Sequence, residues 1–183
     1  APASADVIGK IANGIADDML TTTIMACKCP KLISPAMNTN MFTNPIVQDN
    51  LKKLEHYGYE IIQPDSGYLA CGDTGAGKMP SEQVLLNYIL RTIAKDKDMT
   101  GIKLTVTAGP TREKLDPVRF LSNNSTGKMG YAIAKMAMLR GADVTLISGK
   151  VSLEPVPFVK MVDIVSAEDM YNAVIKSAKD ADI

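Results

Sequence analysis

The segment best suited to chemistry runs from Gly67 to Pro80 and places Cys71 among four glycines. Glycine allows positive φ angles and a close approach of the backbone to a ligand, so this composition predicts a mobile flap instead of a packed element. A thiol carried on such a flap can meet a ligand that binds and leaves. The alternative for a cysteine among glycines is a surface turn with an incidental buried thiol.

A second candidate is the segment Pro35-Ala-Met-Asn38-Thr-Asn40-Met41-Phe42, which follows a short apolar run. Because the carboxamide of Asn38 offers both a donor and an acceptor, it is suited to holding a carboxylate or an amide. The alternative is a turn in which Asn38 caps the backbone.

A third candidate lies where Gly109-Pro-Thr111-Arg112 follows a β-rich run and Ser122-Asn123-Asn-Ser125 leads toward a helical pattern. Backbone amides at the start of a helix favour anions, so these loops predict a phosphate or nucleotide site. The glycine spacing matches neither the dinucleotide-binding motif nor a Walker loop. Arg119 and Lys128 could equally be solvated charges.

The remaining cysteines and the single histidine do not predict a metal site. Cys27 and Cys29 lack Cys-x-x-Cys spacing, and we expect them to be buried free thiols. His56 falls at the end of a predicted helix, where we expect it to lie on the surface without a catalytic role.

Strands that alternate with helices predict an α/β fold with parallel sheets. In such sheets ligands bind beyond the carboxyl ends of the strands, where the loops at 1–6, 35–41 and 67–80 fall. Strands are expected at 31–36, 59–63, 103–108, 142–148 and 160–165, and helices after Ser4 or Asp6, Asp18, Asn44, Ser81, Gly127 and Ser166.

Loops are expected at 37–43 and 109–126. In two helices the apolar periodicity predicts which side chains face inward. They are Val84, Leu85, Tyr88, Ile89 and Ile93 in one, and Met129, Ile133, Met136 and Ala137 in the other.

The charged stretch 95–100 has no apolar pattern and is the best linker candidate, which divides the chain into residues 1–97 and 98–183. Both ends look internal to a longer protein. A formal net charge of zero indicates neither a nucleic-acid partner nor an anionic membrane. Three cysteines in 183 residues indicate the reducing cytoplasm and not a disulfide framework.

Three motifs of the first half carry a resemblance: Pro2-Ala3-Ser4-Ala, Pro35-Ala-Met37-Asn38-x-x-Met41 and Gly67-x-x-Ala70-Cys71-Gly72-x-x-Gly75-x-Gly77-Lys78-Met79. They resemble the homo-oligomeric flavin-containing cysteine decarboxylases. In the second half, the run from Thr107 to Gly130 resembles the start of phosphopantothenate–cysteine ligase. The tandem order resembles the bifunctional coenzyme A biosynthesis family, with this chain as a central piece.

The first resemblance implies a flavodoxin-like fold with FMN as cofactor, and decarboxylation of 4'-phosphopantothenoylcysteine to 4'-phosphopantetheine. It implies that the substrate thiolate is oxidised, that CO2 leaves, and that Cys71 donates a proton as the electrons return. Asn38 would hold the substrate carboxylate, while Ala3, Ser4 and Met37 would line the flavin site. The substrate clamp would comprise Gly67, Ala70, Gly72, Gly75, Gly77, Lys78 and Met79.

Three residues depart from the family pattern: Asp6 replaces a frequent Asn, Phe42 a Trp, and Lys78 an Arg. Lys78 could still meet a phosphate as a point charge, without the bidentate geometry of Arg. The family's catalytic histidine and Gly/Ser-rich phosphate loop are expected upstream of Ala1, and His56 does not replace that histidine.

The second resemblance implies a Rossmann-like nucleotide-binding unit that uses CTP with Mg2+. It implies that 4'-phosphopantothenate is activated as an acyl-cytidylate, from which the amine of cysteine displaces CMP. Arg119 and Asn123 match family residues tied to that intermediate. The wider nucleotide loop would comprise Gly109, Thr111, Arg112, Ser125, Gly127 and Lys128.

The family also implies homo-oligomers, with trimeric packing of the first half and dimers of the second. The sequence therefore predicts two incomplete three-layer α/β units of an enzyme of coenzyme A biosynthesis, inactive as this piece alone. The alternative is a Rossmann-like nucleotide-binding module of a larger assembly, with no chemistry of its own.

Overall fold

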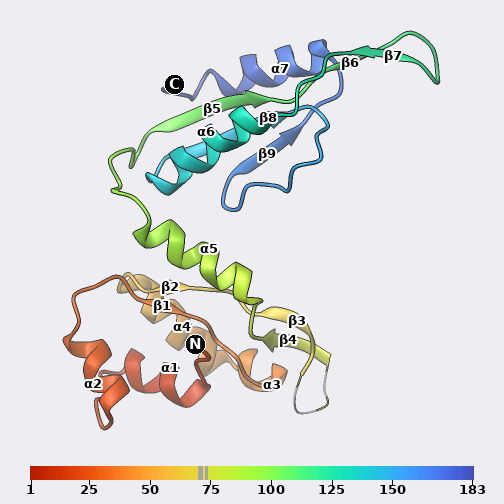
Figure 1. The fold of residues 1–183 in the computed structure, drawn as a ribbon. Coiled ribbons are helices and arrows are strands. Elements are labelled where there is room, and N and C mark those ends of the chain that lie inside the picture. Colours follow the sequence, from red (N-terminus) through yellow and green to blue (C-terminus); the bar gives the residue numbers. More distant parts are fainter. Residues whose placement is uncertain (70–71, 73) are drawn as a thin grey trace. The chain divides into compact units, whose positions relative to one another are not determined.

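The computed structural model describes residues 1–69, 72 and 74–183 (Figure 1). The chain forms two compact units, Ala1–Ile89 (unit 1) and Leu90–Ile183 (unit 2). Within the described residues, no helix combines the length and the apolar character that a membrane span requires.

In its described residues unit 1 contains short strands and four helices of its own, and a fifth helix crosses its boundary. In chain order the elements are α1 (Ala5–Ala12), α2 (Met19–Ala26), β1 (Leu32–Ile33), α3 (Thr39–Phe42), α4 (Pro45–His56), β2 (Glu60–Ile61), β3 (Asp65–Tyr68), β4 (Thr74–Lys78) and α5 (Glu82–Ile93).

The helices of unit 1 begin where their capping residues predict. The Ser4 hydroxyl accepts from the amide of Val7 at the start of α1, and Asp18 forms a capping box with Thr21 in α2. Asn44 caps α4 with Pro45 in the first turn. These pairings satisfy amides that the helix itself leaves without partners.

The core of unit 1 joins α1 and α4 to the parallel pair β1–β2, in which Ile33 is in register with Ile61. Parallel strands are therefore confirmed here. The cluster includes Ile8 and Leu54, which are almost fully buried. His56, at the end of α4, is exposed as predicted.

Two segments of unit 1 that were predicted to be irregular contain regular structure in their described residues. The loop expected at 37–43 contains α3, because Asn38 caps a helical turn there. The expected flap is an antiparallel hairpin, with Gly67 opposite Gly75 and Tyr68 opposite Thr74. Low strand propensity in glycine is here outweighed by the cross-strand ladder. The expected strands at 31–36 and 59–63 are shorter than predicted.

The buried face predicted for α5 is wrong. Val84, Ile89 and Ile93 are exposed, and only Leu85 and Tyr88 of the predicted set are partly buried. Periodicity identifies an apolar stripe, but burial also requires a surface of the described chain to cover that stripe.

Unit 2 contains three layers. Its elements are β5 (Lys103–Ala108), β6 (Arg112–Lys114), β7 (Phe120–Ser122), α6 (Lys128–Leu139), β8 (Asp143–Ser148), β9 (Lys160–Asp163) and α7 (Ala167–Ser177). Strands β5, β8 and β9 form a parallel sheet in that order.

Helices α6 and α7 cover opposite faces of this sheet, as the alternating side chains of β5 show (Figure 1). Leu104 and Val106 pack in one cluster with residues of α6. Lys103 and Thr105 point to the other face, where they line a cavity together with α7. The βαβ prediction for this half is confirmed.

The buried face predicted for α6 is largely wrong. Met129, Ile133 and Met136 are exposed at 78%, 47% and 44%, whereas Gly130 and Ala134 face the sheet with Ala137. A Cβ on Gly130 would lie 2.6 Å from that of Ala108, so the helix approaches the sheet closely through small residues. Hydrophobic periodicity does not predict that small residues are required where a helix approaches a sheet this closely.

Three further predictions differ from the structure. Residues 109–126 are not a simple loop, because β6 and β7 pair antiparallel within them. The expected linker is bound to α6: Lys97 Nζ donates to the carbonyl of Leu139, and Asp98 pairs with Arg140. Cys29 is exposed and Cys27 partly buried, so neither is the buried thiol expected.

Candidate functional site

The first two motifs of unit 1 meet through their backbones. Ala3 forms a parallel bridge with Pro35, in which its amide donates to Ser34 and its carbonyl accepts from Ala36. Both distances are short, 2.8 and 3.0 Å. Because the amide and the carbonyl of Ala3 are both paired, only its largely buried methyl group remains for contact with a ligand.

The third motif joins the second through glycines of β4. The amide of Met37 donates to the carbonyl of Gly77 at 3.0 Å. A Cβ on Gly77 would lie 2.2 Å from the carbonyl oxygen of Met37, and one on Gly75 would lie 2.5 Å from Thr39 Oγ1. The base of the hairpin is therefore docked on the segment that precedes and begins α3, and side chains are excluded there.

Asn38 lies in the middle of this contact and is partly buried. Its Oδ1 accepts from the amide of Asn40 at 2.8 Å and caps α3. The capping turn that the sequence offered as an alternative is therefore present. The same bond fixes the plane of the carboxamide, which is also what holding a carboxylate would require.

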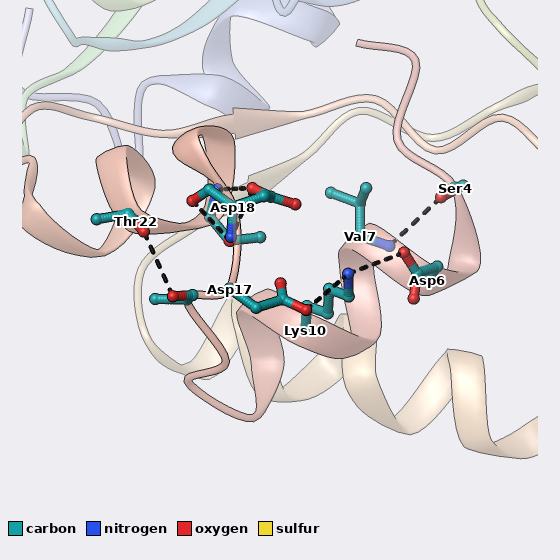
Figure 2. Close-up of polar contacts among 9 residues, drawn as sticks. Ser4, Asp6, Val7, Lys10, Asp17, Asp18 and Thr22 are labelled. Carbon is teal, nitrogen blue, oxygen red and sulfur yellow. Dashed lines mark hydrogen bonds and ion pairs between the residues drawn. The ribbon is translucent and has the colours of Figure 1, made fainter.

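Figure 2 shows the polar contacts around α1. Ser4 Oγ receives the amide of Val7 at 3.3 Å, so the cap uses the hydroxyl as an acceptor. Lys10 Nζ lies 3.5 Å from Asp6 and 3.2 Å from Asp17. The hydrogen bond that Lys10 Nζ donates to the carboxylate of Asp17 is the main cause that raises the pKa of Lys10. The carboxylate of Asp6 is thus directed toward a cation of its own helix.

The remaining predicted clamp residues lie along the hairpin. Lys78 and Met79 are exposed at the end of β4, and Gly72 has a positive φ of 88°. The Lys78 side chain passes next to Gly67 on the opposite strand. Ala70 and Cys71 lie outside the residues that the structure describes.

Two hydroxyls that the sequence analysis missed are buried in this site. Ser34 Oγ and Thr39 Oγ1 have no hydrogen-bond partner within the described part of the chain. An unpaired buried hydroxyl is unfavourable, so these oxygens are candidates to bind a polar ligand. Together with Ser4 and the side-chain-free glycines, they fit a ligand such as FMN. Thr39 could have been found from its place inside the Asn38 motif.

In unit 2 the ends of β5 and β8 are packed against each other. A Cβ on Gly149, after β8, would lie 1.8 Å from the carbonyl oxygen of Pro110, after β5. Gly127, which begins α6 with a φ of 75°, lies beside Gly109. The two strand ends and the start of the helix are therefore held in close contact.

Next to these strand ends lies a pocket of about 540 Å³. Its lining comprises Pro110, Arg112, Phe120, Ser122, Asn123, Asn124, Ser125, Thr126, Lys150, Val151 and Ser152. Of the predicted nucleotide-loop residues, the structure brings Arg112, Asn123 and Ser125 together around this pocket. Lys150 and Ser152 were missed, although residues that follow a parallel strand are expected at such sites.

The other predicted residues of this loop are not in the lining. Arg119 is 77% exposed at the tip of the β6–β7 hairpin, where its Nε pairs with Asp116. Thr111 accepts from Ser122 through its carbonyl, and Lys128 is exposed in the first turn of α6. The described residues contain no cluster of three or more His, Cys, Asp or Glu side chains that could hold a metal ion.

Comparison with known proteins identifies the family. Residues 1–94, more than half of the chain, match the model described as Flavoprotein. The chain belongs to the flavoprotein family. Residues 99–183 match the model described as the DNA/pantothenate metabolism flavoprotein C-terminal domain.

Curated relatives match both parts in one protein. The Bacillus subtilis protein named coenzyme A biosynthesis bifunctional protein CoaBC is 47% identical over 186 residues, which cover 100% of this chain and 46% of that protein. The Escherichia coli K12 protein of the same name is 45% identical over 100% of this chain and 45% of its own length. This flavoprotein chain thus spans about half the length of the curated relatives it matches.

Among solved structures, a PPC decarboxylase mutant complexed with pantothenoylaminoethenethiol is 38% identical. The match covers 49% of this chain and 50% of that one, with a TM-score of 0.48.

Proposed function

We propose that this chain forms the central part of a bifunctional enzyme of coenzyme A biosynthesis. Unit 1 would contribute to an FMN-dependent decarboxylase that converts 4'-phosphopantothenoylcysteine to 4'-phosphopantetheine. Unit 2 would contribute to a ligase that joins 4'-phosphopantothenate to cysteine with CTP and Mg2+. The domains proposed are residues 1–97, flavodoxin-like, and 98–183, Rossmann-like.

The observation that carries the decarboxylase proposal is the joining of three separate motifs by backbone contacts. Ala3 bonds to the end of β1, and Met37 bonds to Gly77 of the hairpin. Three segments that are far apart in sequence are thus in backbone contact in unit 1, which supports a shared site. Membership of the flavoprotein family supports FMN as the group bound there.

Within that site each residue has a proposed task. Ser4, Ala3, Met37 and the buried hydroxyl of Thr39 would hold FMN, which supplies a two-electron acceptor and donor for the substrate sulfur. Asn38, with its carboxamide fixed by Asn40, would orient the carboxylate that leaves as CO2. Cys71 would return a proton to the product once the carboxylate has gone.

For the ligase, the proposal rests on the pocket beside β5 and β8. Asn123 and Ser125 would position the phosphoryl and acyl groups, and Arg112 would bind anionic oxygens. Arg119 lies outside this lining, so its proposed role requires that the β6–β7 hairpin meets the ligand from its tip. Both halves are proposed to act in homo-oligomers.

The test is made on the full-length protein. We expect it to be purified with a yellow chromophore that has flavin absorption, and to release CO2 from 4'-phosphopantothenoylcysteine. A full-length protein that binds nucleotide but neither FMN nor this substrate would support the alternative of a nucleotide-binding module without chemistry.

A further inference from the structure

Lys150 is held at a fixed place beside the pocket of unit 2. It follows Gly149, whose backbone packs against Pro110 so tightly that no Cβ fits between them. Ser148, which precedes Gly149, is only 1% exposed, and its hydroxyl donates to the carbonyl of Gly149 at 2.8 Å. The backbone that carries Lys150 is therefore constrained, while its side chain is exposed and lines the pocket.

The charged residues that line this pocket are all cationic. Arg112 and Lys150 are its charged lining residues, and its lining includes no Asp or Glu. The guanidinium carbon of Arg112 lies 4.6 Å from the centre of the Phe120 ring. The backbone amide of Arg112 donates to the carbonyl of Val165 at 2.7 Å. Lys150 has no ion-pair or hydrogen-bond partner among the described residues.

The rest of the lining consists mainly of neutral hydrogen-bonding groups. Asn123, Asn124, Ser125, Thr126 and Ser152 supply hydroxyls and carboxamides. Two cations among such donors, at the carboxyl ends of parallel strands, favour a ligand rich in anionic oxygens. A phosphoryl group has this chemistry.

We propose that Lys150, together with the stacked Arg112, binds a phosphoryl group of the ligand in this pocket. This inference rests on the proposed ligase function of unit 2 and adds to it a residue that neither the motifs nor the predicted loop contain. The phosphoryl group could come from the nucleotide or from the phosphorylated acid, and the two arms of the test below distinguish them.

The ammonium acts as an exposed point charge with a flexible stem, so its contribution is expected to be moderate. Removing one charge-assisted hydrogen bond to phosphate at an exposed site is expected to raise Kd about three- to tenfold. Because the site is open to solvent, the effect should diminish as salt is added.

The experiment measures Kd by calorimetry for Mg–CTP and, separately, for 4'-phosphopantothenate in the full-length protein. The variants are Lys150→Gln, Lys150→Arg, and the control Lys135→Gln, which removes the same charge from an exposed position of α6 outside the lining. Thermal unfolding checks that each variant is folded.

We expect Lys150→Gln to weaken one of the two ligands about three- to tenfold at low salt, with Lys150→Arg close to wild type. The ligand affected identifies the source of the phosphoryl group. If Lys150→Gln binds both ligands as Lys135→Gln does, the assignment of Lys150 is wrong while the ligase proposal stands. If the wild-type protein binds neither ligand, both proposals are wrong.

Discussion

The buried hydroxyl of Thr39 allows a binding role of this residue to be distinguished from a purely structural one. Thr39 Oγ1 lies beside Gly75 of the hairpin and has no partner in the described part of the chain. Leaving such a group unpaired costs about 1–3 kcal/mol, so its retention calls for a ligand that satisfies it.

Replacing Thr39 with valine keeps the shape and removes the hydroxyl. Without ligand, we expect Thr39→Val to be as stable as wild type or more stable, by up to about 1 kcal/mol, because no unpaired oxygen is buried. With FMN, the gain in melting temperature of the full-length protein should be smaller than for wild type. The same flavin-dependent gain in both proteins would contradict a binding role for Thr39.

The proposed role of Cys71 can be tested directly, because its proton transfer would follow the loss of CO2. In the full-length protein, Cys71→Ser should still release CO2 but should accumulate the oxidised ene-thiol product, since serine is a much weaker acid than cysteine. Mass spectrometry of the product distinguishes it from 4'-phosphopantetheine. Cys29→Ser serves as the control because Cys29 is exposed on another segment. Normal product at a normal rate from Cys71→Ser would exclude this role.

Asp116 provides a prediction about pH. The backbone amide of Arg119, then its guanidinium, lowers the pKa of Asp116 below the ordinary value for aspartate, about 3.9. A lowered pKa means that the turn gains stability above the ordinary value and loses it as the pH falls through the folded value. Carbon NMR titration should give a midpoint below about 3.9 for Asp116, and Arg119→Gln should move it part of the way back. An unchanged midpoint would show that the guanidinium contributes nothing.

At the level of elements, the β3–β4 hairpin depends on backbone contact at its base. We expect Gly77→Ala to destabilise the hairpin by about 1–3 kcal/mol or more, because φ is 128° and a Cβ would meet the Met37 carbonyl. Gly67→Ala is the matched control, since a Cβ there would make ordinary contact with Lys78 at 3.5 Å. Hydrogen exchange of the Met37 amide measures the difference. Equal exchange in both variants would contradict the docking of the hairpin.

Helix boundaries could be read from the sequence because they depend on local chemistry. Ser4, Asp18, Asn44 and Ser166 each cap the helix that they were expected to begin. The parallel strands β5 and β8 were likewise predictable from β-rich runs on either side of a helix. These features need only the residues within the element or next to it.

The buried faces of the helices and the two β-hairpins could not be predicted from the sequence in the same way. In α6 the methionines form a regular apolar stripe, yet small residues face the sheet, because the distance between helix and sheet is set by Gly130. The β3–β4 ladder forms between strands of low apolar content, and each strand of the β6–β7 ladder is only three residues long. For the site, Asn38 and Arg112 were predictable from motifs, whereas Lys150 required the tertiary fold.

For the whole molecule, the chain spans about half of the relatives that it matches, and each proposed activity needs a complete site. We expect the 183-residue chain alone to catalyse neither decarboxylation nor ligation, while the full-length protein catalyses both. Assays of CO2 release and of CTP-dependent ligation on both proteins test this. Either reaction from the shorter chain would show that its sites are already complete.

The segment after α5 has a practical consequence. Lys97 donates to the carbonyls of Arg91 and Leu139, the amide of Met99 bonds to Arg140, and Asp98 pairs with the Arg140 guanidinium. A protease must draw the chain into its cleft in an extended form, which these bonds oppose. Trypsin should therefore spare the peptide bond after Lys97 until unit 2 unfolds, and a cut intended to separate the two halves would have to be engineered elsewhere.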